Sequence, residues 1–420
     1  MLRSMRFAGK SAISEHLVIR RETEENRAPL EAGNPAARAA KTADRFRKLY
    51  GEDCLLYRAP GRINLIGEHT DYNEGFVMPV AINFYCWVAI CPAEGRAVEV
   101  HSTNFNERRS FDLDRPQPFG DWSDYVQGVA FMLQRAGLQL QGGKMLISSD
   151  VPIGSGLSSS AALEVAAALA LLGQQNTSYD RNQLALSCQR AENEFVGARC
   201  GIMDQFIACH GQAGRLLMLD CRSLEYRLLP VPEDLRLVIC NTMVRHAIAA
   251  GEYNARRSQC EEGGRLLSRT RPGISALRDA TLEDLERHGN VLPPEILKRC
   301  RHVISENQRV VAAAAALEKN NLNEFGELMA ASHESLRHDY EVSCPELDLM
   351  VNLARQVEGV YGARMTGGGF GGCTLNLVAK EAVGNFQKEI ASKYQEQTGK
   401  SPEIYVSTAS EGAGRWEETA

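Results

Sequence analysis

The chain has 420 residues, more than the roughly 250 to 300 that a single hydrophobic core usually holds, so two domains are expected. Its apolar fraction of 44% and charged fraction of 24% are typical of soluble globular proteins. A net charge of -6 argues against binding to nucleic acid or to an anionic membrane surface, and no apolar run reaches the roughly 18 residues of a membrane helix. The expected partners are small molecules.

Two sequence features bear on the cellular compartment of the protein. Residues 1–35 mix basic with acidic side chains, whereas mitochondrial transit peptides are poor in acidic residues, so we expect a flexible extension. The 12 cysteines are scattered from Cys54 to Cys373, and no two have the two-residue spacing of zinc and redox motifs. We therefore expect buried free thiols and a cytoplasmic location.

The first predicted domain, residues 36–235, has a mixed α/β pattern. Short apolar runs separated by glycine loops predict strands at residues 55–57, 63–66, 76–82, 85–91, 98–101 and 144–148. Helical spacing predicts helices at 125–135 and 179–195, with an alanine-rich helix ending at Gly173 between them. A strand pair is predicted at 216–219 and 226–229. Pro230, Pro232 and Asp234 then break the pattern.

The second predicted domain, residues 236–420, is also α/β. Strands are predicted at residues 235–240, 363–366, 373–378 and 404–407. Helical periodicity predicts helices at residues 252–267, 281–288, 294–317, 323–338, 345–357 and 380–397. The sequence shows no repeat of fixed period, which excludes solenoids and propellers.

A turn rich in glycine and serine joins the strand at 144–148 to the alanine-rich helix. Its glycines allow the backbone to approach an anion, and the free N–H groups and positive dipole of the first helical turn face that position. The candidate phosphate-binding residues are Gly154, Ser155, Gly156, Leu157, Ser158, Ser159 and Ser160. The alternative is a serine N-cap on a buried helix. No Walker lysine follows the turn, so any ATP is bound in another way.

A loop crowded with polar side chains follows the strand at 63–66. Glu68, His69 and Asp71 offer several hydrogen-bonding groups within four residues, which suits recognition of adjacent hydroxyls on a sugar. A solvated turn formed by Asp71 or Asn73 is the alternative. A metal site is disfavoured because no second histidine lies one helical turn away.

Asp204 is a single acid among apolar residues in the segment 200–206. It is either a helix N-cap or a functional carboxylate. A partly buried aspartate beside Arg62 would stay ionised and well positioned, as a kinase needs near an acceptor hydroxyl.

The segment 367–372 contains the spacing G-x-G-x-x-G at Gly367, Gly369 and Gly372. A strand rather than a helix is predicted after it, which argues against a dinucleotide-binding site. The chain also lacks the HRD and DFG tripeptides of protein kinases. We interpret the segment as a tight hairpin that lines the active site, with a plain turn as the alternative.

Taken together, these segments resemble the galactokinase branch of the GHMP kinase superfamily, which also contains homoserine, mevalonate and phosphomevalonate kinases. GRINLIGEHTDYN at residues 61–73 resembles the galactokinase signature, and the glycine-serine turn and residues 367–372 resemble two superfamily motifs. The resemblance implies a two-domain α/β fold of the α+β type, with a ribosomal-protein-S5-domain-2-like N-terminal domain containing a left-handed βαβ crossover, a ferredoxin-like C-terminal domain, and the active site between them. It implies transfer of the γ-phosphate of ATP to the anomeric hydroxyl of galactose. We expect a monomer or weak dimer, although no sequence feature addresses the oligomeric state.

The resemblance also implies roles for individual residues. Asp204 would accept or orient the proton of the anomeric hydroxyl, and Arg62 would stabilise the charge on the transferred phosphoryl group. Galactose would be held by Glu68, His69, Thr70, Asp71, Gly201, Asp204 and Tyr253. The ATP phosphates would lie against residues 154–160, and Ser160 with Glu192 would coordinate Mg²⁺.

Two other functions stay open at this stage. The same motifs suit a kinase for N-acetylgalactosamine or another hexose, because small changes in a pocket alter substrate choice. The family also includes non-catalytic sensors that bind galactose and ATP and lose part of the serine-alanine stretch. Residues 156–162 keep that stretch complete, which favours an enzyme.

Overall fold

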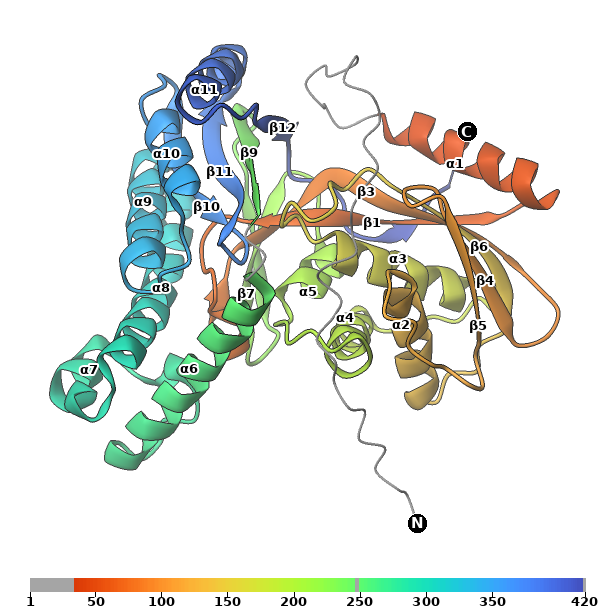
Figure 1. Ribbon diagram of the computed structural model, residues 1–420, viewed down its shortest axis with the longest axis horizontal. Coiled ribbons are helices and arrows are strands. Elements are labelled where there is room, and N and C mark those ends of the chain that lie inside the picture. The colour runs from red at the N-terminus through yellow and green to blue at the C-terminus, as the bar shows by residue number, and fades with distance from the viewer. Residues whose placement is uncertain (1–33, 246–248, 418–420) are drawn as a thin grey trace.

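The computed structural model describes residues 34–245 and 249–417. The predicted N-terminal extension lies outside the described residues, apart from its last two positions. The described chain forms a six-stranded, a four-stranded and a three-stranded sheet with helices packed around them (Figure 1). The mixed α/β class expected from the sequence is therefore confirmed.

The six-stranded sheet has the order β13-β1-β3-β6-β4-β5. Its strands are β1 (Leu55–Asn64), β3 (Pro79–Pro92), β4 (Ala97–Ser102), β5 (Glu107–Asp112), β6 (Gly143–Ser149) and β13 (Gly414–Arg415). Neighbouring strands are antiparallel except β4 and β6, which run parallel. Helix α1 (Pro35–Tyr50) covers one face, and α3 (Ser159–Gly173) with α2 (Ser123–Arg135) covers the other (Figure 1).

Strand β3 shows why this sheet forms, because it is buried on both faces. Successive side chains of a strand point to opposite faces. Tyr85 and Trp87 therefore pack in the cluster with Phe46 of α1, whereas Cys86 and Val88 lie in the main core. A strand covered by helices on both sides needs a continuous apolar run, and residues 84–91 supply it.

The predicted strands at 55–57 and 63–66 are wrong in one respect, because they form one strand. β1 continues through Pro60 and Gly61, with a register shift against β3 at that point. The prediction treated this Pro-Gly pair as a break, but a bulge accommodates it. A Cβ on Gly61 would lie 2.7 Å from the carbonyl oxygen of Leu157, so glycine there lets the glycine-serine turn approach the strand.

The helices that follow α3 bring Glu192 and Asp204 into the same region. The predicted helix at 179–195 consists of α4 (Arg181–Arg190) and a π-helical turn (Ala191–Val196) that carries Glu192. Such π turns are rare and frequently occur at functional sites. Helix α5 (Met203–His210), which the sequence analysis did not predict, starts shortly afterwards and carries Asp204.

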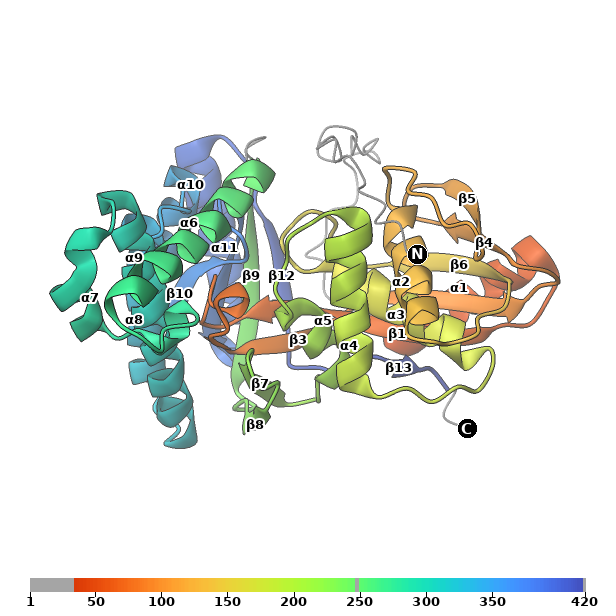
Figure 2. The ribbon, with the colours of Figure 1, turned by 90° about the horizontal axis from the view of Figure 1, so that it is seen from below.

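The four-stranded sheet has the order β10-β11-β9-β12 and is antiparallel throughout. Its strands are β9 (Leu235–Arg245), β10 (Val360–Thr366), β11 (Gly371–Ala379) and β12 (Glu403–Ser407). The helices of this part are α6 (Ala249–Thr270), α7 (Leu282–His288), α8 (Pro294–Glu318), α9 (Leu322–His338), α10 (Pro345–Ala354) and α11 (Val383–Thr398). They gather at one end of the molecule, and α1, β4 and β5 lie at the other (Figure 2).

The remaining elements are small. The three-stranded sheet contains β2 (Phe76–Val77), β7 (Arg215–Asp220) and β8 (Tyr226–Pro230). Short 3₁₀ turns lie at Asp71–Asn73, Leu277–Asp279, Gly289–Val291 and Lys380–Ala382. Within residues 34–245 and 249–417, no helix combines the length and the apolar character needed to cross a membrane.

The predicted division at residue 235 stays a prediction. β9 begins at Leu235 and lies in the four-stranded sheet. The end of the chain returns to the six-stranded sheet, however, because β13 pairs with β1 and the Ser410 N–H donates to the Ala81 carbonyl. A two-residue strand has too little pattern to be recognised from sequence.

Candidate active site

Arg62 and Asp204 meet although they are far apart along the chain. The Nε of Arg62 donates to Oδ1 of Asp204 at 2.8 Å, and Nη2 donates to Oδ2 at 2.7 Å. The third guanidinium nitrogen, Nη1, donates to the carbonyl oxygen of Gly156 at 2.5 Å. Because a bidentate pair fixes both side chains in plane and orientation, Asp204 is held at a defined position beside the glycine-serine turn.

The glycine-serine turn does not cap α3 with a serine side chain. Ser158 occupies the N-cap position with a positive φ of 58°, and its hydroxyl makes no capping bond. It donates instead to Oδ2 of Asp204. Ser155 donates to the carbonyl oxygen of Pro152 at 2.7 Å, within the turn itself. The turn is therefore connected directly to the Arg62–Asp204 pair, and the capping alternative is wrong.

A second polar group lies on the face of α3 that carries Ser160. The hydroxyl of Ser160 is 3.5 Å from Oε1 of Glu192. Gln205, which follows Asp204 in the chain, uses its Nε2 to donate to Glu192 at 2.7 Å and to Glu164 at 2.9 Å. Burial and the charge of Asp204 raise the pKa of Glu192 to about 7, and burial raises the pKa of Glu164 well above its usual value.

This second group offers the oxygen atoms that Mg²⁺ prefers. Oε1 of the fully buried Glu164 has no hydrogen-bond partner among the described residues, so one more acceptor lies in the group. The described residues contain no cluster of three or more His, Cys, Asp or Glu side chains arranged to hold a metal ion. Ser160 and Glu192 offer two oxygen ligands, so an ion held there would need further ligands, such as phosphate oxygens. The sequence signal for Glu164 was its position as a single acid in the apolar run 161–172.

The predicted sugar-binding residues lie mainly in the loop between β1 and β2, residues 65–75, which we call the sugar loop. The Asp71 carboxylate packs directly on Gly201, where a Cβ would lie 1.8 Å from Oδ2. Both residues line a cavity of about 220 Å³ together with Arg257. Burial and the charge of Asp204 raise the pKa of Asp71 to about 6.

His69 and Tyr253 form an aromatic group beside Asp71. Their ring centroids are 5.6 Å apart, and Nδ1 of His69 is 2.8 Å from the hydroxyl of Tyr72. Burial, and to a lesser extent neighbouring positive charge, holds the pKa of His69 well below its usual value, so the ring is neutral. Its Nε2 has no hydrogen-bond partner among the described residues.

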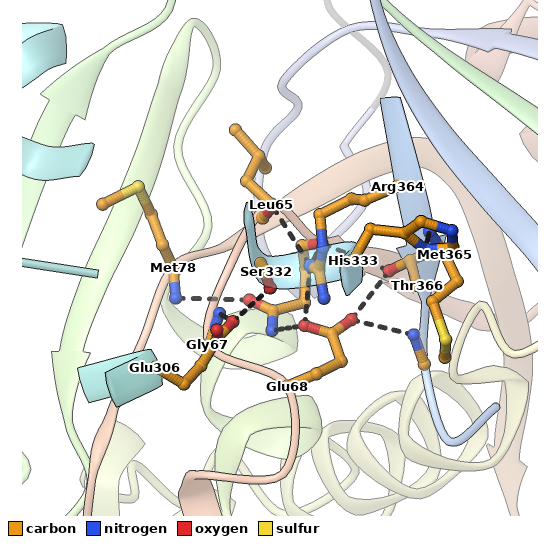
Figure 3. Close-up of polar contacts among 12 residues, drawn as sticks. Leu65, Gly67, Glu68, Met78, Glu306, Ser332, His333, Arg364, Met365 and Thr366 are labelled. Carbon is orange, nitrogen blue, oxygen red and sulfur yellow. Dashed lines mark hydrogen bonds and ion pairs between the residues drawn. The ribbon is translucent and has the colours of Figure 1, made fainter. Parts of the chain in front are cut away.

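Glu68 and Thr70 contact protein groups rather than open space. The buried Glu68 carboxylate accepts bonds from Arg364 at 2.9 Å and from Thr366 at 3.0 Å, both on β10 (Figure 3). The Gly367 N–H and the side chain of Asn64 also donate to it. The hydroxyl of Thr70 lies 2.8 Å and 2.6 Å from the carbonyl oxygens of Gly67 and Phe76. Sequence reasoning missed the bonds from Arg364, Thr366 and Gly367 because they link segments almost 300 residues apart.

The glycine-rich segment 367–372 is a hairpin between β10 and β11, as predicted. Gly367 lies against Gly156, and Gly372 lies against Ser155, since a Cβ on either would come within 4 Å of the turn's backbone. A Cβ on Gly368 would touch the ring of Tyr253. The hairpin therefore lies between the glycine-serine turn and the aromatic group, which excludes a plain surface turn.

This fold and site define a kinase of the GHMP class. The family models described as "GHMP kinases N terminal domain" and "GHMP kinases C terminal" match residues 124–212 and 313–396. A third model, "Galactokinase galactose-binding signature", matches residues 44–92. A galactokinase of Roseiflexus sp. (strain RS-1) is 46% identical over 374 residues, which cover 89% of this chain and 96% of the relative.

A galactokinase of Chloroflexus aggregans is 49% identical, covering 88% of this chain and 95% of its own length. Among solved structures, Lactococcus lactis galactokinase complexed with galactose matches with a TM-score of 0.86 at 36% identity, covering 90% of this chain and 99% of that one. Methanococcus jannaschii mevalonate kinase, at 20% identity and a TM-score of 0.62, covers 86% of this chain and 99% of its own, and shares the fold. The chain belongs to the galactokinase family.

Proposed function

We propose that this chain transfers the γ-phosphate of ATP to the anomeric hydroxyl of galactose, giving galactose 1-phosphate and ADP. Members of its family are ATP-dependent sugar kinases. The observation that carries the proposal is the bidentate Arg62–Asp204 pair, which is bonded to the glycine-serine turn through Gly156 and Ser158. It joins a group suited to the acceptor hydroxyl with a turn suited to the phosphates.

The proposed chemistry needs few protein groups, because phosphoryl transfer depends mainly on positioning and on electrostatic stabilisation. Asp204 accepts or orients the proton of the anomeric hydroxyl as its oxygen attacks the γ-phosphorus. Arg62 holds that carboxylate in place and stabilises the charge that develops on the phosphoryl oxygens. Residues 154–160 bind the phosphates through backbone N–H groups at the start of α3.

Galactose is proposed to bind beside Asp204, against the sugar loop. Asp71 accepts bonds from its hydroxyls, Gly201 leaves room for that carboxylate, and His69 offers its unpartnered Nε2. Tyr253 packs on the sugar through its ring, a common use of aromatic side chains in ligand pockets. Glu68 and Thr70 are proposed to support galactose binding by holding the sugar loop in shape, through their bonds to Arg364 and Gly67. Any direct bond from either residue to galactose would be made in addition to these bonds.

Mg²⁺ is proposed to be held by Ser160 and Glu192. Their oxygens fit this ion, and Gln205 keeps the Glu192 carboxylate turned toward Ser160. When bound, the ion neutralises charge on the ATP phosphates. We also propose that the protein acts in the cytoplasm as a monomer or weak dimer without nucleic-acid or membrane partners. None of the 12 cysteines, which all lie among the described residues, forms a disulfide in the structure, which suits a reducing compartment.

A coupled assay of ADP release tests the proposal. Galactose, N-acetylgalactosamine, glucose and mevalonate are offered in turn at equal concentration with MgATP. We expect galactose to give the highest kcat/KM. Absence of turnover with galactose, or a clear preference for N-acetylgalactosamine, would contradict the proposed substrate.

A further inference from the structure

One face of helix α8 holds the backbone of the sugar loop. Nε2 of His302 is 3.1 Å from the carbonyl oxygen of Glu68, and a carboxylate oxygen of Glu306 accepts the Gly67 N–H at 2.9 Å. The side-chain oxygen of Asn307 accepts the Phe76 N–H at 2.8 Å, at the far end of the loop. His302 and Glu306 lie on one face of α8 because residues four apart share a helical face. Through this face, a helix of the C-terminal part binds a loop that precedes it by more than 200 residues.

Glu306 is the charged member of this face and is fully buried. Its Oε1 accepts both the Gly67 N–H and the hydroxyl of Ser332, at 2.6 Å (Figure 3), and its Oε2 accepts Nε of Arg309 at 2.7 Å. Burial is the largest single influence and raises the pKa of Glu306. The charges of Arg309, His302 and Arg364, with the bond from Ser332, together outweigh burial and lower that pKa to about 2. The residue is thus a carboxylate with all its bonds directed at fixed partners.

The bonds from α8 lie just before a strained residue. His69 has a positive φ of 65°, a left-handed conformation that is costly for a residue with a Cβ. Such conformations persist where surrounding contacts enforce them, commonly at ligand sites. Glu306 and His302 bind the N–H of Gly67 and the carbonyl of Glu68, the groups that lead into His69.

We propose that Glu306 is a positioning residue for galactose binding. By holding the Gly67 N–H it fixes the sugar loop, and so keeps the His69 ring against Tyr253 and the Asp71 carboxylate against Gly201. The inference rests on the proposed function, because it takes His69 and Asp71 to bind the hexose. It assigns a role in galactose affinity to a residue that touches neither substrate.

Glu306→Gln tests the inference because the substituted side chain has the same shape. Gly67, Ser332 and Arg309 all donate to the Glu306 carboxylate, but the glutamine amide has one acceptor oxygen. If that oxygen faces Gly67 and Ser332, the NH₂ group faces the Arg309 donor, and in the opposite orientation it faces the other two donors. We expect the galactose KM, and the galactose dissociation constant from calorimetry, to rise about tenfold. The ATP KM should stay within twofold of wild type, since Glu306 makes its bonds to Gly67, Ser332 and Arg309 rather than to residues 154–160.

Asp284→Asn is the matched control. Asp284 is a largely buried acid of the same C-terminal part that also pairs with an arginine, Arg271, but it does not contact the sugar loop. This variant should lose thermal stability without any change in galactose KM. Ser332→Ala is a milder second variant that removes one donor to Glu306, with an expected two- to threefold rise in galactose KM.

The outcomes separate the inference from the function on which it rests. If wild type fails to bind or phosphorylate galactose, the proposed function is wrong. If wild type does both and Glu306→Gln binds galactose normally, only the positioning role is wrong. Equal rises in galactose and ATP KM would also overturn it. Should Glu306→Gln fail to fold, an unchanged galactose KM in Ser332→Ala would overturn the inference.

Discussion

Replacing Gly201 with alanine should displace the Asp71 carboxylate. The new Cβ would lie 1.8 Å from Oδ2 and 2.2 Å from Cγ of Asp71, whereas ordinary contacts begin at 3.4 Å. The carboxylate must therefore move by more than an ångström. Misplacing a binding group by roughly 1 Å can cost on the order of 10²-fold, so the galactose KM should rise about 100-fold, or about 2.7 kcal/mol.

Steady-state ADP release, with galactose and ATP varied separately, measures this effect. The ATP KM should change little, because Gly201 is not part of the glycine-serine turn. Gly264→Ala is the control, since a Cβ on this glycine of α6 would have nothing within 4 Å. A Gly201→Ala enzyme with normal galactose KM would refute the placement of galactose against Asp71.

Three further predictions concern charge and metal binding. Since the pKa of Asp71 is about 6, protonation of its carboxylate should weaken galactose binding up to about tenfold per pH unit below 6. Calorimetry from pH 5 to 7 measures this, and a galactose affinity that does not change with pH would contradict it. In the Asp71→Asn variant the affinity should not change with pH. Because the pKa of Glu192 is raised from 4.5 to about 7, the folded state binds its proton more tightly, and stability falls as pH rises through that window. Glu192→Gln should therefore raise the melting temperature more at pH 8 than at pH 5, and an equal change at both would count against it. Ser160→Ala removes one ligand, so the Mg²⁺ concentration needed for half-maximal rate should rise about tenfold. Galactose affinity measured by calorimetry should stay unchanged. An unaltered Mg²⁺ requirement would remove Ser160 from the metal site.

The parts of the fold that the sequence predicted best are those with strong local patterns. The apolar run at residues 85–91 and the periodicity of α8 and α9 are visible within a short window. The structure joins that run to residues 79–82 in β3, whereas the sequence predicted two separate strands there. The structure corrected the prediction where a local signal misled, as at Pro60-Gly61, which bulges without ending β1. It added β5, whose sequence ERRSFD is polar because the strand lies at the sheet edge.

The candidate site was predictable as motifs but not as a set of contacts. Asp204 had two interpretations because an acid at a helix start is usually a cap. The structure rules out the cap, since Ile202 holds the N-cap position and the Asp204 carboxylate is bonded to Arg62. The chemical role of Asp204 stays a prediction. Glu306 and Arg364 carry no local signal, because their partners on the sugar loop lie more than 230 residues away.

The turnover number of Asp204→Asn tests the central claim most directly. Asparagine keeps the shape of the side chain but loses the charge and one acceptor. We predict that kcat with galactose falls by on the order of 10² to 10⁴, or about 2.7 to 5.4 kcal/mol, while ATP affinity is largely unchanged. A variant that retains near-normal turnover would contradict the assignment of Asp204 to the chemical step.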